Sequence, residues 1–193
     1  MSRPPKILAF AGSLRKDSFN KKLLRIVVHG ARNAGAEVTC VELNDYPMPI
    51  FDQDFEATSG PPDTVKALKA MMIAHDGFLI ASPEYNSSVT AVLKNTIDWV
   101  SRPERDKPAT FAFQRKAAAI MSASPSGLGG LRGLVHLRSI LSNIGVIVWP
   151  DQVAVSEAQQ AFDADGNLIN SKRQQAAENL GADLTKLLSK WIA

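Results

Sequence analysis

Short runs of consecutive apolar residues alternate along the chain with longer segments in which apolar residues recur every three or four positions. A continuous apolar run of about four to eight residues is typical of a strand buried on both faces of a parallel sheet. One further segment alternates apolar and polar residues, as a strand with one covered face does. Together these patterns predict strands at residues 7–11, 36–43, 77–82, 116–122 and 146–150.

The periodic segments predict helices with apolar side chains on one face and wetter residues on the other. Pro62 stands near the first turn of one such segment and Gly35 follows another, and these residues favour a helix start and a helix stop there. The predicted helices are residues 19–33, 62–74, a segment ending near residue 100, residues 131–144 and roughly residues 171–192.

Strand and helix alternate five times, which favours an α/β fold with a parallel sheet, right-handed crossovers and helices on both faces. We find no internal repeat or linker, so we expect a single domain over residues 1–193. Residues 44–63 predict a long proline-rich connection with a short helical turn. We interpret its acidic cluster, Asp52, Asp54 and Glu56, as solvated rather than metal-binding, because no histidine or further carboxylate supports coordination.

The loop after the first apolar run carries side chains that favour anion binding: Ser13, Arg15, Ser18 and Asn20. It joins a strand to a helix start, where unpaired N–H groups and the helix dipole attract an anion, and the guanidinium fork matches a phosphate. An equally good explanation is that Ser18 merely caps the helix and Arg15 is solvated. The loop has neither a GxGxxG nor a Walker A motif, which disfavours an NTPase or a dinucleotide-fingerprint enzyme.

Two more predicted strands end in loops that suit a ligand, since ligands in such folds sit beyond the carboxyl ends of the strands. Pro83-Glu84-Tyr85-Asn86 offers a flat aromatic ring and backbone groups to a planar heterocycle, or else forms a turn with Tyr85 packed on the next helix. Residues 122–130 contain glycines that let backbone approach a ligand, or else form an ordinary strand-to-helix turn. Three such loops at one sheet edge favour a shared pocket.

The 193 residues carry a formal net charge of +3 and a sequence pI of about 9.1, which fits an anionic small molecule better than nucleic acid. No dense lysine and arginine stripe is interleaved with aromatic residues, so we expect no nucleic-acid partner. No apolar run approaches the roughly 20 residues of a membrane helix, and the first residues do not resemble a signal peptide. We therefore expect a cytoplasmic protein without a membrane partner.

Cys40 is the only cysteine, so the chain forms neither an intramolecular disulfide nor a cysteine-based metal site. It falls in the predicted strand 36–43, where we expect a packed apolar role rather than a reactive thiol. We expect His75 at the end of the helix 62–74, without a chemical role.

Three segments, taken together, are more specific than any one of them. They are Gly12-Ser13-Leu14-Arg15-Lys16-Asp17-Ser18-Phe19-Asn20, Ser82-Pro83-Glu84-Tyr85-Asn86 and Leu93-Lys94-Asn95-Thr96-Ile97-Asp98-Trp99. The sequence that contains them resembles the NADPH-dependent FMN reductase family, which includes quinone and chromate reductases, over roughly three quarters of the chain. The resemblance implies a flavodoxin-like three-layer sandwich with a five-stranded parallel sheet in the order 2-1-3-4-5.

The resemblance also implies a bound FMN and assigns residues to it. The FMN phosphate would be held by Ser13, Arg15, Ser18 and Asn20. The isoalloxazine and ribityl region would be held by Pro83, Glu84, Tyr85 and Asn86, and the third loop would add Ser122, Ser124 and Gly127. Asp17 stands where glycine is common in relatives, and we expect it to point outward. No catalytic side chain and no metal is implied, and we interpret Glu84 as a loop organiser rather than a proton donor.

The implied reaction is a hydride transfer from NADPH or NADH to N5 of FMN, after which a quinone, free flavin, azo compound or metal oxyanion such as chromate takes the electrons. Arg102, Arg105 and Lys107 either meet the NADPH 2′-phosphate or belong to a solvated loop. Such reductases form dimers and tetramers, so a homodimer or homotetramer is expected, with residues 131–144 and 44–63 as candidate interfaces. The alternatives are a flavodoxin-type electron carrier without NAD(P)H turnover and a regulatory protein with a vestigial flavin site.

Overall fold

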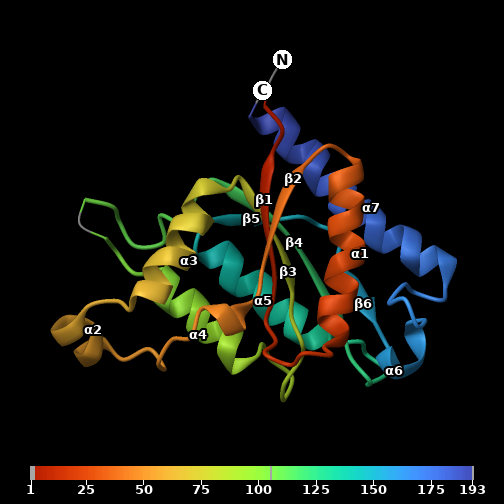
Figure 1. Ribbon diagram of the computed structural model, residues 1–193, viewed down its shortest axis with the longest axis horizontal. Helices are drawn as coiled ribbons and strands as arrows, with labels where there is room; N and C mark the ends of the chain where they lie inside the picture. Colours follow the sequence, from red (N-terminus) through yellow and green to blue (C-terminus); the bar gives the residue numbers. More distant parts are fainter. Residues whose placement is uncertain (1–2, 105, 193) are drawn as a thin grey trace.

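The computed structural model describes residues 3–104 and 106–192, which form a parallel sheet covered by helices on both faces (Figure 1). The path through the sheet is β2-β1-β3-β4-β5, which confirms the flavodoxin-like strand order. These strands are β1 (Lys6–Ala11), β2 (Glu37–Val41), β3 (Gly77–Ala81), β4 (Lys116–Ala123) and β5 (Val146–Val148).

The helices divide between the two faces of the sheet (Figure 1). One face carries α1 (Phe19–Asn33) and α7 (Ser171–Trp191), and the other carries α3 (Asp63–Ala74), α4 (Ala91–Val100) and α5 (Leu131–Asn143). Successive side chains of a strand point to opposite faces, so each central strand contributes to both cores. Ile7 and Ala9 belong to the core beneath α1 and α7, whereas Leu8 and Phe10 belong to the opposite core. This double burial explains why the central strands are continuous apolar runs.

The backbones of α1 and α7 are almost in contact. A Cβ atom at Gly181 would lie 2.0 Å from Val27 O, and one at Gly30 would lie 2.0 Å from Glu178 O. Only glycine fits at these two positions, and the close approach lets the two helices bury their apolar stripes against the same face of the sheet. No helix among the described residues combines the length and the apolar character needed to cross a membrane.

The sheet position beyond β4 is filled by two short strands rather than by the single strand predicted at residues 146–150. β5 pairs with residues 116–118 at the start of β4, and β6 (Val153–Val155) pairs with residues 121–123 at its end. Pro150 lies between them and has no N–H for a ladder, which interrupts the strand. A short helix, α6 (Ala158–Ala161), follows before α7.

The predicted long connection between β2 and α3 forms an arm. It contains a 3-10 turn, η1 (Leu43–Asp45), and the helix α2 (Gln53–Ser59), which stands out from the body of the molecule (Figure 1). The side chain of Asp52 caps α2 by accepting hydrogen bonds from two backbone N–H groups of its first turn. Glu56 forms an ion pair with Arg102 at 2.8 Å. Asn95 and Trp99 of α4 both donate to Pro49 O at 2.8 Å, which fixes the arm to the body.

Cys40 and His75 lie near the β2 edge of the sheet. Cys40 is exposed, so the prediction of a packed cysteine is wrong, because β2 is an edge strand that neighbouring elements cover only in part. Partial desolvation of the sulfur raises the pKa of the Cys40 thiol, which does not favour a reactive thiolate. His75 follows α3, and its ring contacts Met71 O at 2.6 Å and Thr39 Oγ1 at 2.9 Å, which is a structural role.

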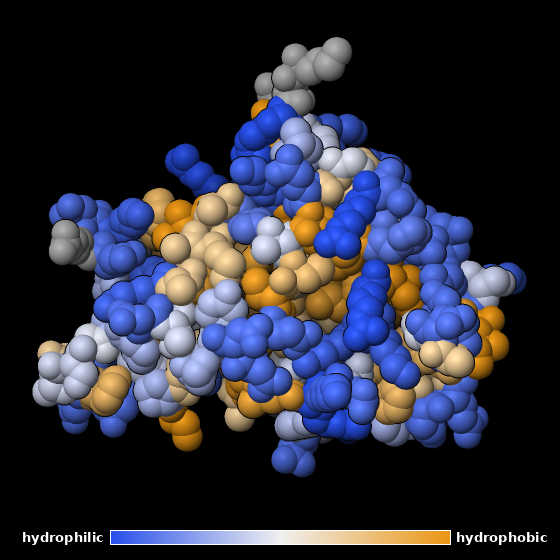
Figure 2. Space-filling model, viewed as in Figure 1, coloured by the Kyte–Doolittle hydropathy of each residue, from blue (hydrophilic) through white to orange (hydrophobic). Residues whose placement is uncertain are grey.

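Apolar side chains are visible on the surface between α3 and α1, in front of β2 (Figure 2).

Candidate functional site

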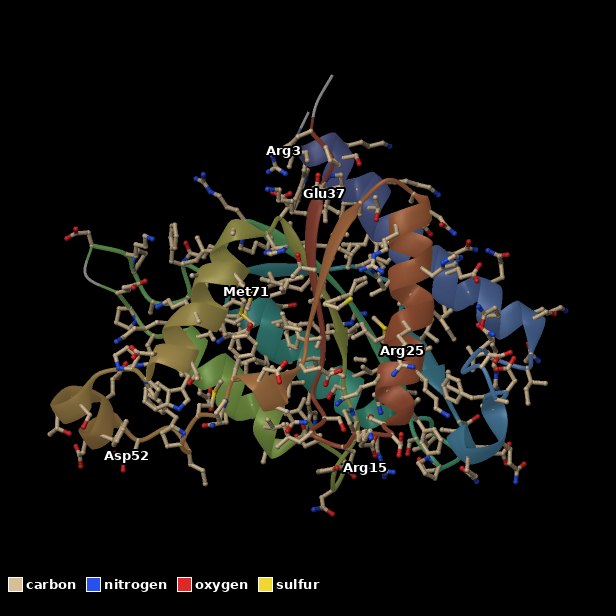
Figure 3. The ribbon with its side chains drawn as sticks, in the orientation of Figure 1. Arg3, Arg15, Arg25, Glu37, Asp52 and Met71 are labelled. Carbon is tan, nitrogen blue, oxygen red and sulfur yellow. The ribbon has the colours of Figure 1, made fainter. Side chains whose placement is uncertain are left out.

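The carboxyl ends of β1, β3 and β4 lie side by side, which brings the three loops to one edge of the sheet. Ala81 is level with Ala11 on one side and with Met121 on the other. The Gly12 N–H donates to Ala81 O at 2.8 Å, and the Thr90 hydroxyl donates to Gly12 O at 2.7 Å. Figure 3 shows Arg15 at this end of the molecule, opposite the end that carries Arg3. The prediction that the three loops meet is confirmed.

The first loop ends at a serine that occupies the N-cap position of α1 without capping it. Ser18 has the extended backbone of an N-cap (φ −80°, ψ 129°), yet its hydroxyl makes no capping hydrogen bond. The alternative that Ser18 is an ordinary cap is therefore wrong. Within residues 3–104 and 106–192, no protein group accepts a hydrogen bond from the backbone N–H groups of Ser13, Leu14, Lys16 and Asp17. The loop thus presents free donors at the positive end of a helix.

The side chains of this loop suit a phosphate. Ser13 and Ser18 are each 4% exposed, so their hydroxyls are recessed. Arg15 and Asp17 are exposed, and neither forms an ion pair with another described residue. A phosphate monoester suits this donor set, which combines free N–H groups, two buried hydroxyl groups and an exposed guanidinium. The outward position of Asp17 agrees with the expectation from the sequence.

Asn20 is 3% exposed, and its amide is hydrogen-bonded to the end of β4, the strand that precedes the third loop. Its Nδ2 donates to Ala123 O at 2.8 Å, and its Oδ1 accepts from the Ala123 N–H at 3.0 Å. An amide has one further N–H and one further lone pair, so these two bonds leave capacity for a ligand. In this structure Asn20 fixes the start of α1 to the end of β4.

The second loop is a tight hairpin. The Tyr85 N–H donates to Ser88 O and the Ser88 N–H donates to Tyr85 O, each at 3.0 Å. Asn86 and Ser87 between them have φ values of 50° and 66°, as a two-residue type I′ turn requires. The turn of the alternative interpretation is present, but Tyr85 is 53% exposed, so its ring is not buried against the following helix. Pro83 is buried at the base of the hairpin, where the chain leaves β3.

Glu84 anchors this hairpin to the first turn of α5. Its carboxylate accepts hydrogen bonds from Arg132 Nε at 2.8 Å and from the Gly133 N–H at 3.1 Å. Burial alone would raise the pKa of Glu84, but the Gly133 N–H and the Arg132 guanidinium together hold it below its ordinary value. Glu84 is therefore ionised, which favours its interpretation as a loop organiser over that of a proton donor.

The third loop divides into an exposed part and a buried part. Ser124 Oγ accepts from the Ser126 N–H at 3.2 Å, and Gly127 is exposed with open space around its Cα. Ser122 is fully buried, and its hydroxyl has no hydrogen-bond partner among the described residues. A Cβ atom at Gly130 would lie 1.9 Å from Ser122 Oγ, so the loop backbone covers that hydroxyl. The structure brings Ser124 and Gly127, but not Ser122, to the surface at this edge.

Several residues that shape the site were not found from the sequence. Thr90 caps α4 by accepting from the Leu93 N–H, and it also holds the Gly12 carbonyl of the first loop. A threonine directly before a helical segment is a signal that could have identified it. Arg132 and His136, four residues apart on α5, both contact the hairpin. Their helical spacing is visible in the sequence, but their partners are not.

The loop that follows α4 has structural partners of its own. Arg102 pairs with Glu56 and lies 5.2 Å from the centre of the Phe51 ring. Lys107 exchanges backbone hydrogen bonds with Glu104, and its ammonium lies 5.1 Å from the centre of the Phe111 ring. Arg105 lies outside the described residues. Arg102 is thus engaged in holding the arm rather than free for a second phosphate.

Known proteins are similar to this chain in both sequence and fold. The sequence model of the family described as NADPH-dependent FMN reductase matches residues 5–160. An NAD(P)H-dependent FMN reductase of Pseudomonas aeruginosa is 36% identical over 176 residues, which cover 91% of this chain and 90% of the relative. An NADPH:quinone oxidoreductase of Arabidopsis thaliana is 36% identical over 170 residues, with coverage of 86% and 82%.

A solved structure supports the same assignment. The flavoenzyme NAD(P)H:(acceptor) oxidoreductase FerB of Paracoccus denitrificans superposes with a TM-score of 0.80 at 26% identity, covering 96% of this chain and 98% of that one. The family match includes all three loops at the carboxyl edge of the sheet, from the free donors before α1 to the glycines before α5. This chain therefore belongs to the NADPH-dependent FMN reductase family.

Proposed function

We propose that this protein is an FMN-dependent oxidoreductase that takes a hydride from NAD(P)H and delivers the electrons to a quinone. The class of reaction is that of the family, and the two relatives described above are named for FMN and quinone reduction. The single structural observation that carries the proposal is the set of free backbone donors before α1, next to a serine that does not cap its helix. These donors fit the phosphate of FMN.

When bound, FMN supplies the ring that accepts a hydride and passes the electron pair to the acceptor. Its phosphate would be held by Ser13, Arg15 and Ser18 together with the free N–H groups of that loop. Its ring would be held by the hairpin that carries Tyr85, together with Ser124 and Gly127 of the third loop. Because Tyr85 is 53% exposed, this rim is open, so NAD(P)H and then the acceptor can enter one after the other.

A quinone that accepts a hydride on one oxygen also needs a proton on the other. In the proposal this proton comes from water, since Glu84 is held ionised by the Gly133 N–H and Arg132 and the rim is open to solvent. The chain contributes binding and orientation rather than acid–base catalysis by a side chain.

Anaerobic addition of NADPH to the purified protein tests the proposal. We expect the absorbance of the bound flavin to bleach and to return when 1,4-benzoquinone is added. Retained FMN without bleaching would favour the electron-carrier alternative, which neither the fold nor the comparisons favour. A colourless protein that FMN does not stabilise would favour a vestigial site, because FMN at 100 times its Kd should add about 2.7 kcal/mol of stability.

We further propose that free flavins, azo compounds and chromate can serve as electron acceptors. We also propose that the protein is located in the cytoplasm. The protein forms a homodimer or homotetramer through α5, where Leu131 is 41% and Val135 is 59% exposed. Light scattering of the wild type and of Val135→Glu tests this assembly, since a charge at such an interface should yield monomers. A wild type that is already monomeric would contradict it.

A further inference from the structure

The hairpin that we assign to the flavin ring turns through two residues with left-handed backbone. Asn86 and Ser87 have φ values of 50° and 66°, and neither is glycine. This turn matches the twist of a hairpin, but left-handed backbone is costly for residues with a side chain, least so for asparagine. Such a conformation persists where the surrounding structure holds it in place.

α5 holds both sides of this hairpin, which lies beside the first turns of the helix (Figure 1). Before the turn, Glu84 accepts from Arg132 Nε at 2.8 Å and from the Gly133 N–H at 3.1 Å. After the turn, Ser88 Oγ lies 2.9 Å from His136 Nδ1. Arg132 and His136 are four residues apart, so they project from the same face of α5. Together these contacts form a clamp at the base of the hairpin.

Gly133 sets the distance between α5 and the hairpin. A Cβ atom at this position would lie 3.1 Å from Ser88 O and 3.3 Å from Glu84 Cβ. Both distances are tighter than ordinary contacts, so a Cβ atom at residue 133 would require the hairpin to shift by a few tenths of an ångström. Gly133 lies within the regular α5 helix, where any residue can adopt the backbone. The close approach, rather than backbone freedom, therefore favours glycine here.

We propose that Arg132, Gly133 and His136 are positioning residues for the oxidoreductase reaction, which act through the hairpin without touching the flavin or the acceptor. Tyr85 lies between the two anchored residues and is 53% exposed, so the clamp fixes the base of the hairpin and leaves its aromatic tip free to meet the ring. The inference rests on the proposed function, because it names what orients the proposed ring-binding hairpin. The loop before α1 takes no part in the clamp, so the phosphate and ring parts of the site can be disturbed separately.

Binding of FMN and riboflavin to clamp variants tests the inference, because riboflavin has the ring and lacks the phosphate. Arg132→Ala, Gly133→Ala and His136→Ala should each weaken binding of both flavins by the same factor, about tenfold, and should shift the visible spectrum of the bound flavin. His136→Asn should restore much of the affinity, since an amide can bond to Ser88. Arg25→Ala, an exposed arginine in the middle of α1 (Figure 3), is the matched control and should bind both flavins as the wild type does.

A double-mutant cycle of Glu84→Gln and Arg132→Ala should be non-additive, because both changes release the same contact. Unchanged affinities and spectra in Arg132→Ala and His136→Ala would overturn the clamp, and so would a loss confined to FMN, which would place Arg132 at the phosphate. Neither result contradicts the proposed function if NADPH still bleaches the flavin that is bound to the wild type. A wild type that binds neither flavin would overturn the proposed function itself. If Gly133→Ala does not fold, Arg132→Ala and His136→Ala, both at exposed positions, test the inference without it.

Discussion

Asn20 and Ala123 exchange two hydrogen bonds although 103 residues separate them in the sequence. Asn20 Nδ2 donates to Ala123 O at 2.8 Å, and the Ala123 N–H donates to Asn20 Oδ1 at 3.0 Å. Both residues are buried. The pair joins the start of α1 to the end of β4, so the first and third loops keep a fixed distance from each other before any ligand binds.

Asn20→Ala should destabilise the protein without bound flavin by about 2 kcal/mol, since it leaves the buried N–H and carbonyl of Ala123 without partners. Urea unfolding measures the change. Asn33→Ala is the matched control, because Asn33 is exposed at the other end of α1 and should change the free energy of unfolding by less than about 0.5 kcal/mol. Equal effects of the two substitutions would show that the Asn20 amide does not hold the loops.

Glu84 should make the stability of the protein depend on pH in the acid range. Its pKa in the folded protein lies below the ordinary value of 4.5, because the Gly133 N–H and Arg132 outweigh the effect of burial. The ionised form therefore stabilises the fold above pH 4.5, and this contribution is lost as the pH falls through the lowered pKa.

The difference in unfolding free energy between the wild type and Glu84→Gln should thus be largest near neutral pH and should shrink as the pH falls below 4.5. The same series on Asp165→Asn, at an exposed carboxylate whose side chain has no partner among the described residues, is the control for the loss of one negative charge. A difference that grows toward acid pH would contradict the contacts assigned to Glu84.

Gly181→Ala should destabilise the protein by about 2 kcal/mol, although alanine is a better helix former than glycine. The added Cβ would lie 2.0 Å from Val27 O and would force α7 away from α1. Thermal or urea unfolding measures the effect. The exposed Ala176→Gly, on the same helix, should cost only about 1 kcal/mol through helix propensity. A stabilising effect of Gly181→Ala would mean that the two helices can separate freely.

Arg102→Ala should leave the preference between NADPH and NADH unchanged, because Arg102 is engaged by Glu56 and Phe51. Loss of the Arg102 side chain should instead make the arm that carries α2 more mobile. The ratio of KM values for the two nicotinamides tests the first point, and proteolysis within residues 47–60 tests the second. A selective rise in the KM for NADPH would assign Arg102 to the 2′-phosphate after all.

The sequence predicts the architecture well because both cores are recorded in the spacing of apolar residues. Ile7 to Ala11 is buried on both faces, so its run is continuous, and α1 has the predicted bounds of residues 19–33. The edge strand β2 is covered in part, and Cys40 is exposed there, which the apolar pattern did not reveal. The short strand β6 was missed because Pro150 divides one sheet position into two pieces.

Only those parts of the candidate site that depend on the order of strands and loops along the chain could be predicted from the sequence. The loops after β1, β3 and β4 follow from strand ends, and they meet because parallel strands end at one edge. Contacts between distant residues carry no local signal, so the Asn20–Ala123 pair and the clamp of α5 on the hairpin did not emerge. The burial of Ser122 depends on how closely Gly130 crosses β4, which only the folded chain determines.

The central claim is that the loop before α1 binds the phosphate of FMN, and Arg15 is the residue that tests it most directly. Its guanidinium lies at the sheet edge where β1 ends, whereas Arg25 projects from the middle of α1 (Figure 3). Removal of a charge-assisted hydrogen bond to phosphate should weaken binding about tenfold.

The decisive measurement is the affinity of FMN relative to riboflavin in the wild type, Arg15→Ala and Arg25→Ala. We expect the wild type and Arg25→Ala to prefer FMN by about a hundredfold, since several donors face the phosphate. Arg15→Ala should lose about tenfold in FMN affinity and nothing in riboflavin affinity. Equal binding of the two flavins by the wild type, or an equal loss of both in Arg15→Ala, would contradict the claim.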